Sequence, residues 1–286
     1  MSDFVTIFEM GPRDGLQNEK TFVPTADKIR LVDMLTECGF RKIEVTSFVS
    51  PKWVPQMADA TEVMEGIYRH PAVCYTALTP NATGYAAAKR VSADEIAVFG
   101  SASEGFSKKN INCSVAESIE RFKPVIEKAH KDHIPVRGYI SCVTDCPYDG
   151  PTPPEAVAKV AKILFDLGCY EISLGDTIGA GTPETIGRML DAVLAEVPAK
   201  HVAGHYHDTK GQALANIEVS LDKGLRTFDA AIGGLGGCPY APGAKGNVAT
   251  EAVARLLTAK GYETGLNMEK LAAAASFALS LRSADA

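Results

Sequence analysis

The chain has 286 residues, of which 46% are hydrophobic and 22% charged, and its formal net charge is -6. This composition is that of an ordinary globular protein, and the negative charge with scattered Lys and Arg argues against a nucleic-acid partner. No apolar run approaches the ~20 residues needed to span a bilayer and no secretory or transit peptide is visible, so we expect no membrane partner and a cytoplasmic location.

Runs of strand composition alternate with helical patterns along the whole chain. The segment 25–38, for example, places Ile29, Val32 and Leu35 at helical spacing and ends at Gly39. The predicted strands are 4–10, 42–48, 72–78, 95–101, 135–141, 170–176, 201–207 and 226–232. The helical segments are 25–38, one after Pro55, 82–90, and those beginning at Ser114, Thr152, Thr182, Gln212, about Asn247 and about Met268.

Several predicted helices begin with a residue that can cap the first turn. These residues are Ser114 with Glu117 as a capping box, Thr152, Thr182, and the pair Asp208 and Thr209. Pro124 lies inside the helix that starts at Ser114 and predicts a kink there. The stretch between residue 101 and that helix is expected to be a long loop.

Eight strand-then-helix units imply parallel βαβ connections. At this length they predict a single (β/α)8 TIM barrel that forms one catalytic domain over residues 1–286. An open, doubly wound sheet is the alternative fold. It often shows a glycine-rich phosphate fingerprint after the first strand, and this sequence has none.

The barrel prediction places a site, because active sites of this fold lie at the carboxyl ends of the strands. Polar residues at the predicted ends are Arg13, Asp14, Glu44, Thr46, Asp176, His205 and His207, followed by the segment 233–247. We expect them to converge on one mouth.

Two histidines flank Tyr206 at the end of the seventh predicted strand. Successive side chains of a strand point to opposite faces, so His205 and His207 project the same way, about 7 Å apart, and can reach a common metal ion. Such pairs also occur as exposed polar residues or as hydrogen-bonded core residues. The interpretation as metal ligands therefore depends on further ligands at equivalent positions.

Asp14 is a hard oxygen donor that could join the two histidines. A mixed nitrogen and oxygen set with room for substrate oxygens suits Mg²⁺ or Mn²⁺, and also Zn²⁺ or Co²⁺. The alternatives are that Asp14 is a turn residue beside Gly15, and that Arg13 simply pairs with Glu44 inside the mouth.

The segment 233–247 contains six glycines and two prolines, too many for regular structure. It could close over a ligand as a lid, with Cys238 as an acid or base, or it could be a flexible connection with Cys238 as a small filler. Asn247 can cap a helix or offer a carbonyl oxygen to a metal. The seven cysteines are odd in number and dispersed, which predicts free thiols.

Five long motifs, in order along nearly the whole chain, resemble the 3-hydroxy-3-methylglutaryl-CoA (HMG-CoA) lyase family. They are GPRDGLQNEK (11–20), EVTSFVSPKWVPQMAD (44–59), SLGDTIGAGTP (173–183), GHYHDTKGQALAN (204–216) and GLGGCPYAPGAKGN (234–247). The Arg-Asp pair and HxHD are shared with the wider group of metal-dependent TIM-barrel lyases and Claisen-type synthases. The cysteine-containing glycine loop points to the lyases.

The resemblance implies a role for each matching residue. It implies a divalent cation, usually Mg²⁺ or Mn²⁺, on Asp14, His205, His207 and Asn247. It implies that Arg13 polarises a substrate carbonyl, that Glu44 supports Arg13 and Asp14, that Cys238 is the catalytic thiol of a lid, and that Gln17 and Asp176 line the substrate site.

The implied reaction is cleavage of HMG-CoA to acetyl-CoA and acetoacetate, with Asp14 or His205 as the base. A related 3-hydroxy-3-methylacyl-CoA is the nearest alternative substrate. A Claisen-type synthase is a second alternative, although such enzymes usually carry a further C-terminal domain for which this chain is expected to have no room. A barrel that only binds CoA-like anions is the non-enzymatic alternative. Symmetric assembly into a homodimer or a higher oligomer is expected.

Overall fold

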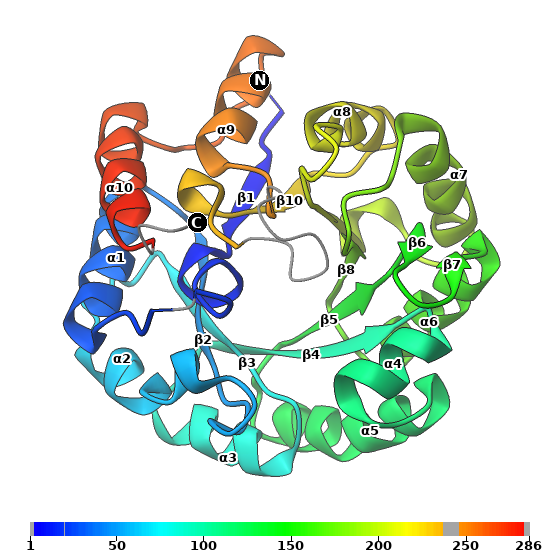
Figure 1. Cartoon of the computed structure of the whole chain (residues 1–286), viewed down its shortest axis with the longest axis horizontal. Helices are drawn as coiled ribbons and strands as arrows, with labels where there is room; N and C mark the ends of the chain where they lie inside the picture. The colour runs from blue at the N-terminus through cyan, green and yellow to red at the C-terminus, as the bar shows by residue number, and fades with distance from the viewer. Residues whose placement is uncertain (1–2, 20, 237–245, 283–286) are drawn as a thin grey trace.

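A computed structural model describes residues 3–19, 21–236 and 246–282 of the chain. Eight parallel strands close into a barrel in the order β1-β10-β9-β8-β5-β4-β3-β2 (Figure 1). They are β1 Thr6–Glu9, β2 Lys42–Ser47, β3 Cys74–Leu78, β4 Glu95–Ser101, β5 Val136–Ser141, β8 Glu171–Asp176, β9 Val202–Tyr206 and β10 Thr227–Ala230. The predicted (β/α)8 barrel is confirmed.

Helices surround the barrel on its outside (Figure 1). Their bounds are α1 Thr25–Glu37, α2 Ala60–Gly66, α3 Ala82–Arg90, α4 Glu104–Ile111, α5 Val115–Lys131, α6 Pro154–Asp166, α7 Pro183–Leu194, α8 Ala213–Asp222, α9 Thr250–Ala259 and α10 Met268–Ser280. A short antiparallel pair, β6 Asp145–Cys146 and β7 Gly150–Pro151, follows β5. None of the helices in the described ranges is long and apolar enough to cross a membrane.

Two of the predicted caps are confirmed. Ser114 forms a capping box with Glu117 at the start of α5, and the Thr182 hydroxyl accepts the Thr185 N–H at the start of α7. Helix α5 runs as one element through Pro124.

Three other helix starts differ from the prediction. Pro153, not Thr152, is the N-cap residue of α6, and its ring offers no hydrogen-bonding group. Helix α8 begins after Gln212, and Asp208 accepts the N–H of its first residue, Ala213, at 3.2 Å. Helix α9 follows Ala249, so Asn247 does not cap it.

The long loop expected before α5 contains helix α4, so that prediction was wrong. The Ser103 hydroxyl caps α4 by accepting the Phe106 N–H, and Asn112, at φ 50°, ends it in the left-handed region. Serine is a common N-cap residue, and asparagine adopts the left-handed conformation more readily than most residues. The helix is short and polar, which explains why hydrophobic periodicity did not reveal it.

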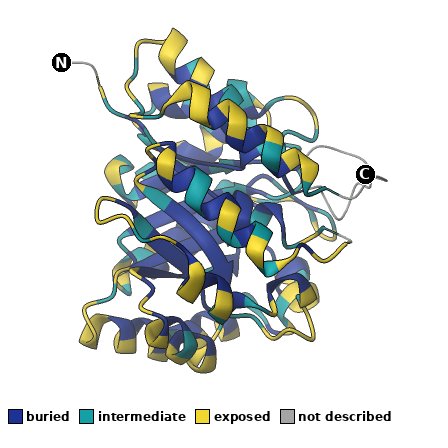
Figure 2. Ribbon diagram, turned by 90° about the vertical axis from the view of Figure 1, so that its left-hand side faces the viewer, coloured by how far each residue is buried: buried dark blue, intermediate teal, exposed yellow. Residues whose placement is uncertain are grey.

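Strand alternation separates two kinds of interior. On β5, Val136 and Ile140 join the large apolar core between strands and helices, whereas Arg137 and Tyr139 take part in a buried polar network. On β10, Asp229 belongs to that network while its neighbour Phe228 belongs to the apolar core. Figure 2 shows the strands buried and the outer faces of the helices exposed. The polar network lies below the mouth of the barrel and supports the site.

Candidate active site

A single π-helical turn over Gly11–Gly15 follows β1 and carries Arg13 and Asp14. The turn is tightly packed, because a Cβ added at Gly15 would lie 2.7 Å from the Leu235 Cβ. Glycine is therefore required at this approach, and the turn holds two charged side chains at the carboxyl end of the barrel.

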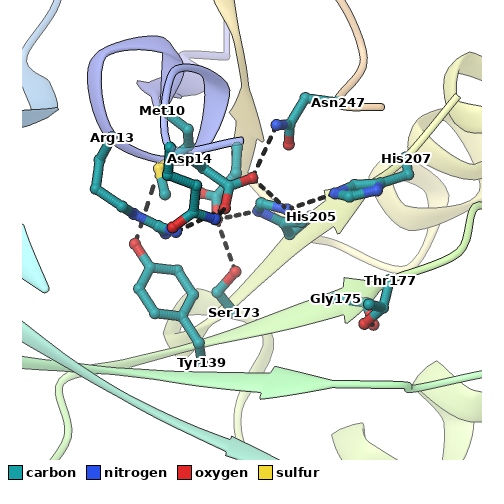
Figure 3. A network of polar contacts seen from close by, with 12 residues as sticks. Met10, Arg13, Asp14, Tyr139, Ser173, Gly175, Thr177, His205, His207 and Asn247 are labelled. Atoms are coloured by element: carbon teal, nitrogen blue, oxygen red, sulfur yellow. Dashed lines mark hydrogen bonds and ion pairs between the residues drawn. The ribbon is translucent and has the colours of Figure 1, made fainter. Parts of the chain in front are cut away.

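Asp14, His205 and His207 form a cluster whose candidate ligand atoms all lie within 4.8 Å of one another. His205 Nε2 is 3.4 Å from His207 Nε2 and 3.8 Å from Asp14 Oδ2 (Figure 3). The predicted convergence of the first and seventh strands is therefore observed. One carboxylate and two imidazole nitrogens, partly exposed to the cavity, make a donor set that fits an octahedral divalent cation with open positions.

Asp229 orients the ring of His205. Its Oδ2 lies 3.1 Å from His205 Nδ1, an arrangement that assigns the ring proton to Nδ1 and leaves the Nε2 lone pair facing Asp14 and His207. Burial alone lowers the pKa of His205, but the hydrogen bond and charge of Asp229, together with Asp14, raise it above its ordinary value.

His207 has a different environment. Burial and the neighbouring His205 lower the pKa of His207 to about 4, so its ring is neutral at physiological pH. Its buried Nδ1 has no hydrogen-bond partner among the described residues. A neutral imidazole with unused nitrogen atoms is the form that binds a metal ion.

Three side chains hold the Asp14 carboxylate. Oδ1 accepts from Arg13 Nη1 at 2.6 Å and from Gln17 Nε2 at 2.9 Å, and Oδ2 accepts from Asn247 Nδ2 at 2.8 Å. Burial opposes ionisation, but Arg13 and the two histidines lower the pKa of Asp14 to about 2. Asp14 is therefore anionic, and Asn247 is within reach of the cluster, with its amide nitrogen turned toward Asp14 (Figure 3).

Arg13 is fixed from two sides. Its Nε donates to Glu44 Oε2 at 2.5 Å, while Nη1 donates to Asp14. Glu44 is fully buried and also accepts the Tyr139 hydroxyl at 3.1 Å. The predicted pairing of Arg13 with Glu44 is observed, and the same guanidinium also binds Asp14. Within the described ranges no hydrogen bond engages Nη2 of Arg13, so this atom can donate to a ligand.

A hydrogen-bonded chain under the mouth connects these groups. Arg137 donates to the Tyr139 hydroxyl at 3.1 Å and binds Asp229 through two bonds of 2.8 and 3.0 Å. Ser173 also donates to Asp229 at 2.7 Å. Because Tyr139 contacts Glu44, the chain runs without interruption from Arg13 to His205. Paired buried charges of this kind fix the orientation of the residues above them.

The structure separates Asp176 from this group. Asp176 is fully buried, accepts from the Thr144 hydroxyl at 3.0 Å and from the backbone N–H groups of Ala180 and Gly181, and does not line the main cavity. Thr46 is buried and donates to the Met57 sulfur. Cys238 and most of the predicted lid lie outside the described residues.

Sequence reasoning missed the supporting residues Arg137, Tyr139, Ser173 and Asp229. Arg137 and Asp229 each stand as a charged residue inside an otherwise apolar strand segment. Buried charges are rare unless paired, so this pattern was a usable signal.

A cavity of about 840 Å³ opens over the cluster. Arg13, His205 and His207 line one part of it, and the cavity extends to Trp53 and to Lys109 on α4. Gln17 lies beside Asp14 in the wall. The volume suits a ligand considerably larger than a metabolite of a few atoms.

Comparison with known proteins supports a family assignment. The HMGL-like family model matches residues 4–278. Hydroxymethylglutaryl-CoA lyase, mitochondrial, of Gallus gallus is 57% identical over 93% of this chain and 90% of its own length. A crystal structure of the HMG-CoA lyase from Brucella melitensis has a TM-score of 0.98 and 63% identity, covering 98% of this chain and 99% of that one.

A more distant solved structure is an HMG-CoA lyase from Acinetobacter baumannii in complex with coenzyme A and 3-methylmalate. It has a TM-score of 0.93 and 35% identity, and the match covers 98% of this chain and 92% of that one. With this fold, this arrangement of Asp14, His205 and His207, and matches over nearly its full length, the chain belongs to the HMGL-like family.

Proposed function

We propose that this chain is a divalent-metal-dependent lyase that cleaves HMG-CoA to acetyl-CoA and acetoacetate. The observation that carries the proposal is the cluster of Asp14, His205 and His207 in a large cavity, in a chain whose relatives are named HMG-CoA lyases. The cavity supports an acyl-CoA substrate, because its lining extends from this cluster to cationic Lys109 and Arg121.

Asp14, His205, His207 and the amide oxygen of Asn247 would hold the cation, with Mg²⁺ or Mn²⁺ as the proposed metal. When bound, the cation supplies Lewis-acid stabilisation to the substrate hydroxyl and carboxylate oxygens. Asp229 and Gln17 act on the protein side by fixing His205 and Asp14 in the geometry described above.

Arg13 is the group that stabilises the negative charge developing on the thioester oxygen as the carbon–carbon bond breaks. Its Nε and Nη1 atoms are held by Glu44 and Asp14, so the guanidinium is oriented before substrate binds. A fixed donor of this kind is worth ~3–4 kcal/mol in the transition state.

We propose Asp14 as the base that removes the proton of the tertiary hydroxyl. His205 already gives its Nδ1–H to Asp229, so once Nε2 is a ligand its ring has no nitrogen left to accept a proton. Asp14 has two oxygens and can bind and accept through different ones. Loss of that proton leaves the oxygen electrons to form the ketone of acetoacetate, while the electrons of the broken bond form the acetyl-CoA enolate.

The remaining roles are proposals that rest on the family resemblance. Cys238 would return a proton to the enolate carbon. Asp176, the last residue of β8, would act through the loop at Ala180 and Gly181 that its carboxylate binds. The relatives are named as both mitochondrial and cytoplasmic enzymes, and we propose a cytoplasmic location for this chain. Assembly as a homodimer or higher oligomer is checked by light scattering on the purified protein.

The direct test is acetoacetate release from HMG-CoA by purified protein with Mg²⁺ or Mn²⁺, with and without EDTA. We expect turnover that EDTA abolishes and added metal restores. If HMG-CoA gives no metal-dependent release but a longer 3-hydroxy-3-methylacyl-CoA is cleaved, the longer acyl-CoA is the substrate. Condensation of acetyl-CoA with a 2-oxo acid would instead indicate a synthase.

A further inference from the structure

Glu9, the last residue of β1, is a fully buried carboxylate outside the metal cluster. Its Oε1 accepts the N–H of Gly11 at 2.7 Å and the N–H of Ile232 at 2.8 Å, and its Oε2 accepts the Thr250 hydroxyl at 2.6 Å. The described residues give it no salt bridge. Burying an ionisable group without an ion pair lowers the stability of the folded chain, so we examine which segments its three hydrogen bonds connect.

Each contact lies on a different segment of the site. Gly11 opens the π-helical turn that carries Arg13 and Asp14. Ile232 opens the turn after β10 that leads to Gly236 in the cavity wall. Thr250 opens α9, three residues after Asn247. One side chain therefore connects the beginnings of three segments that are far apart in sequence.

The packing around the carboxylate leaves little freedom. A Cβ added at Gly11 would lie 2.7 Å from Glu9 Oε1 and 2.9 Å from the Ile232 Cγ2. Beyond this point the same segments meet again, because Asn247 donates to Asp14 and its backbone N–H binds the Gly236 carbonyl at 3.3 Å. The Glu9 contacts and the Asp14–Asn247 bond therefore hold the turn 11–15 and the segment 247–250 together at two points.

We propose that Glu9 is a positioning residue that sets the placement of Asp14 and Asn247 relative to each other, and through them the affinity of the site for its divalent cation. This inference rests on the proposed function. His205 lies in β9 and His207 directly follows that strand, and neither makes a hydrogen bond with Glu9, although His207 forms an isolated backbone bridge with Asn247. The Lys109 end of the cavity is built by α4.

The conservative variant Glu9→Gln separates a positioning role from a need for charge. The glutamine carbonyl can accept both backbone N–H groups, and its amide can donate to the Thr250 hydroxyl, which then acts as an acceptor. We expect Glu9→Gln to retain the Mn²⁺ affinity and kcat of the wild type within about threefold. Glu9→Ala loses all three contacts.

The test is Mn²⁺ binding by calorimetry together with steady-state kinetics on the full chain. For Glu9→Ala we expect Mn²⁺ to bind about 10–100-fold more weakly and kcat at subsaturating metal to fall in parallel, as for other residues that orient ligands. The KM for the acyl-CoA should stay within about threefold, since the Lys109 end is not attached to Glu9.

Glu95→Ala is the matched control, because Glu95 is also buried but binds Lys42 and Tyr170 at the opposite end of the barrel. It should lower the melting temperature and leave Mn²⁺ affinity unchanged. If Glu9→Ala does not fold, Thr250→Val, which removes one contact, should still weaken Mn²⁺ binding several-fold.

Wild-type Mn²⁺ affinity in folded Glu9→Ala, or in Thr250→Val where Glu9→Ala does not fold, overturns the inference while leaving the proposed function intact. Mn²⁺ binding by Glu9→Gln that is as weak as that of Glu9→Ala overturns the inference too. If the wild type itself binds no Mn²⁺, the proposed function is wrong and this inference falls with it.

Discussion

The two ends of the barrel both contain buried charged side chains but satisfy them differently. At the amino end, Lys42 donates to Glu95 at 2.6 Å and to the Tyr170 hydroxyl at 2.7 Å, and that hydroxyl donates to the other Glu95 oxygen at 2.8 Å. The three side chains therefore satisfy one another's hydrogen-bonding groups. This arrangement has no need of a ligand.

At the carboxyl end the pairing is incomplete. His205 and His207 bring two ring nitrogens to 3.4 Å, and the buried Nδ1 of His207 has no partner in the part of the chain that the structure describes. Ring nitrogens placed against each other beside the Asp14 carboxylate are costly unless a cation joins them. Unmatched polar groups, rather than burial or charge alone, therefore identify the functional end.

The largest effect should come from removing a ligand at the carboxyl end. We expect His207→Ala to lower turnover by more than about 10³-fold and to abolish measurable Mn²⁺ binding, because the cation loses a neutral nitrogen that nothing nearby replaces. Acetoacetate release and calorimetric Mn²⁺ titration measure the two quantities.

Glu95→Gln serves as the control for that variant, since it changes a buried charge at the other end of the barrel. It should alter thermal stability alone. Normal Mn²⁺ uptake and turnover in His207→Ala would contradict both the ligand assignment and the distinction between the two ends.

The fold and the candidate ligands could be predicted from the sequence, whereas the residues that support them could not. Eight strands and the convergence of Asp14 with His205 and His207 were predictable, because strand alternation and barrel topology are encoded locally and then fixed by closure. The supporting pair Arg137 and Asp229 depends on contacts between strands that are distant in sequence. A charge inside an apolar strand indicates that a buried partner exists, but no motif identifies which residue that partner is.

Errors occurred where local signals competed. Helix α4 lies where the sequence predicts a loop, because its residues are mostly polar and its existence depends on the caps at Ser103 and Asn112. Thr152 carried the right residue type for a cap but one position too early, since Pro153 takes the cap position.

The second prediction concerns the pH dependence of stability at the carboxyl end. Burial raises the pKa of Glu9 from its ordinary 4.5 to about 7, despite the hydrogen bonds that favour its charged form. Between these two values the folded chain holds a proton that the unfolded chain has lost. The contribution of Glu9 to the free energy of unfolding therefore falls as pH rises from 4.5 to 7, by up to about 3 kcal/mol.

Glu9→Gln removes this titration. The free energy of unfolding of the variant minus that of the wild type should rise between pH 4.5 and 7 and become constant above pH 7. Urea unfolding at several pH values measures it. A difference that is flat, or that falls over this window, would show that the buried carboxyl is not protonated preferentially in the folded chain.

The smallest effect is expected from Asp229→Asn, which changes the hydrogen-bond partner of His205 Nδ1. The variant keeps an oxygen acceptor but loses the charge that fixes the His205 tautomer and binds Arg137 through two bonds. We expect Mn²⁺ affinity to fall about 10–100-fold, as is usual for a residue that orients a metal-binding histidine.

Glu171→Gln provides a matched control, because Glu171 also accepts from Arg137, at 2.8 Å, but has no bond to His205. Both variants disturb the same buried arginine, so both should lower stability. Only Asp229→Asn should weaken Mn²⁺ binding, since it alone releases the histidine ring. Equal Mn²⁺ affinities in the two variants would show that the polar network supports the barrel without orienting the ligand, and the two ends would then differ only in which residues they bury.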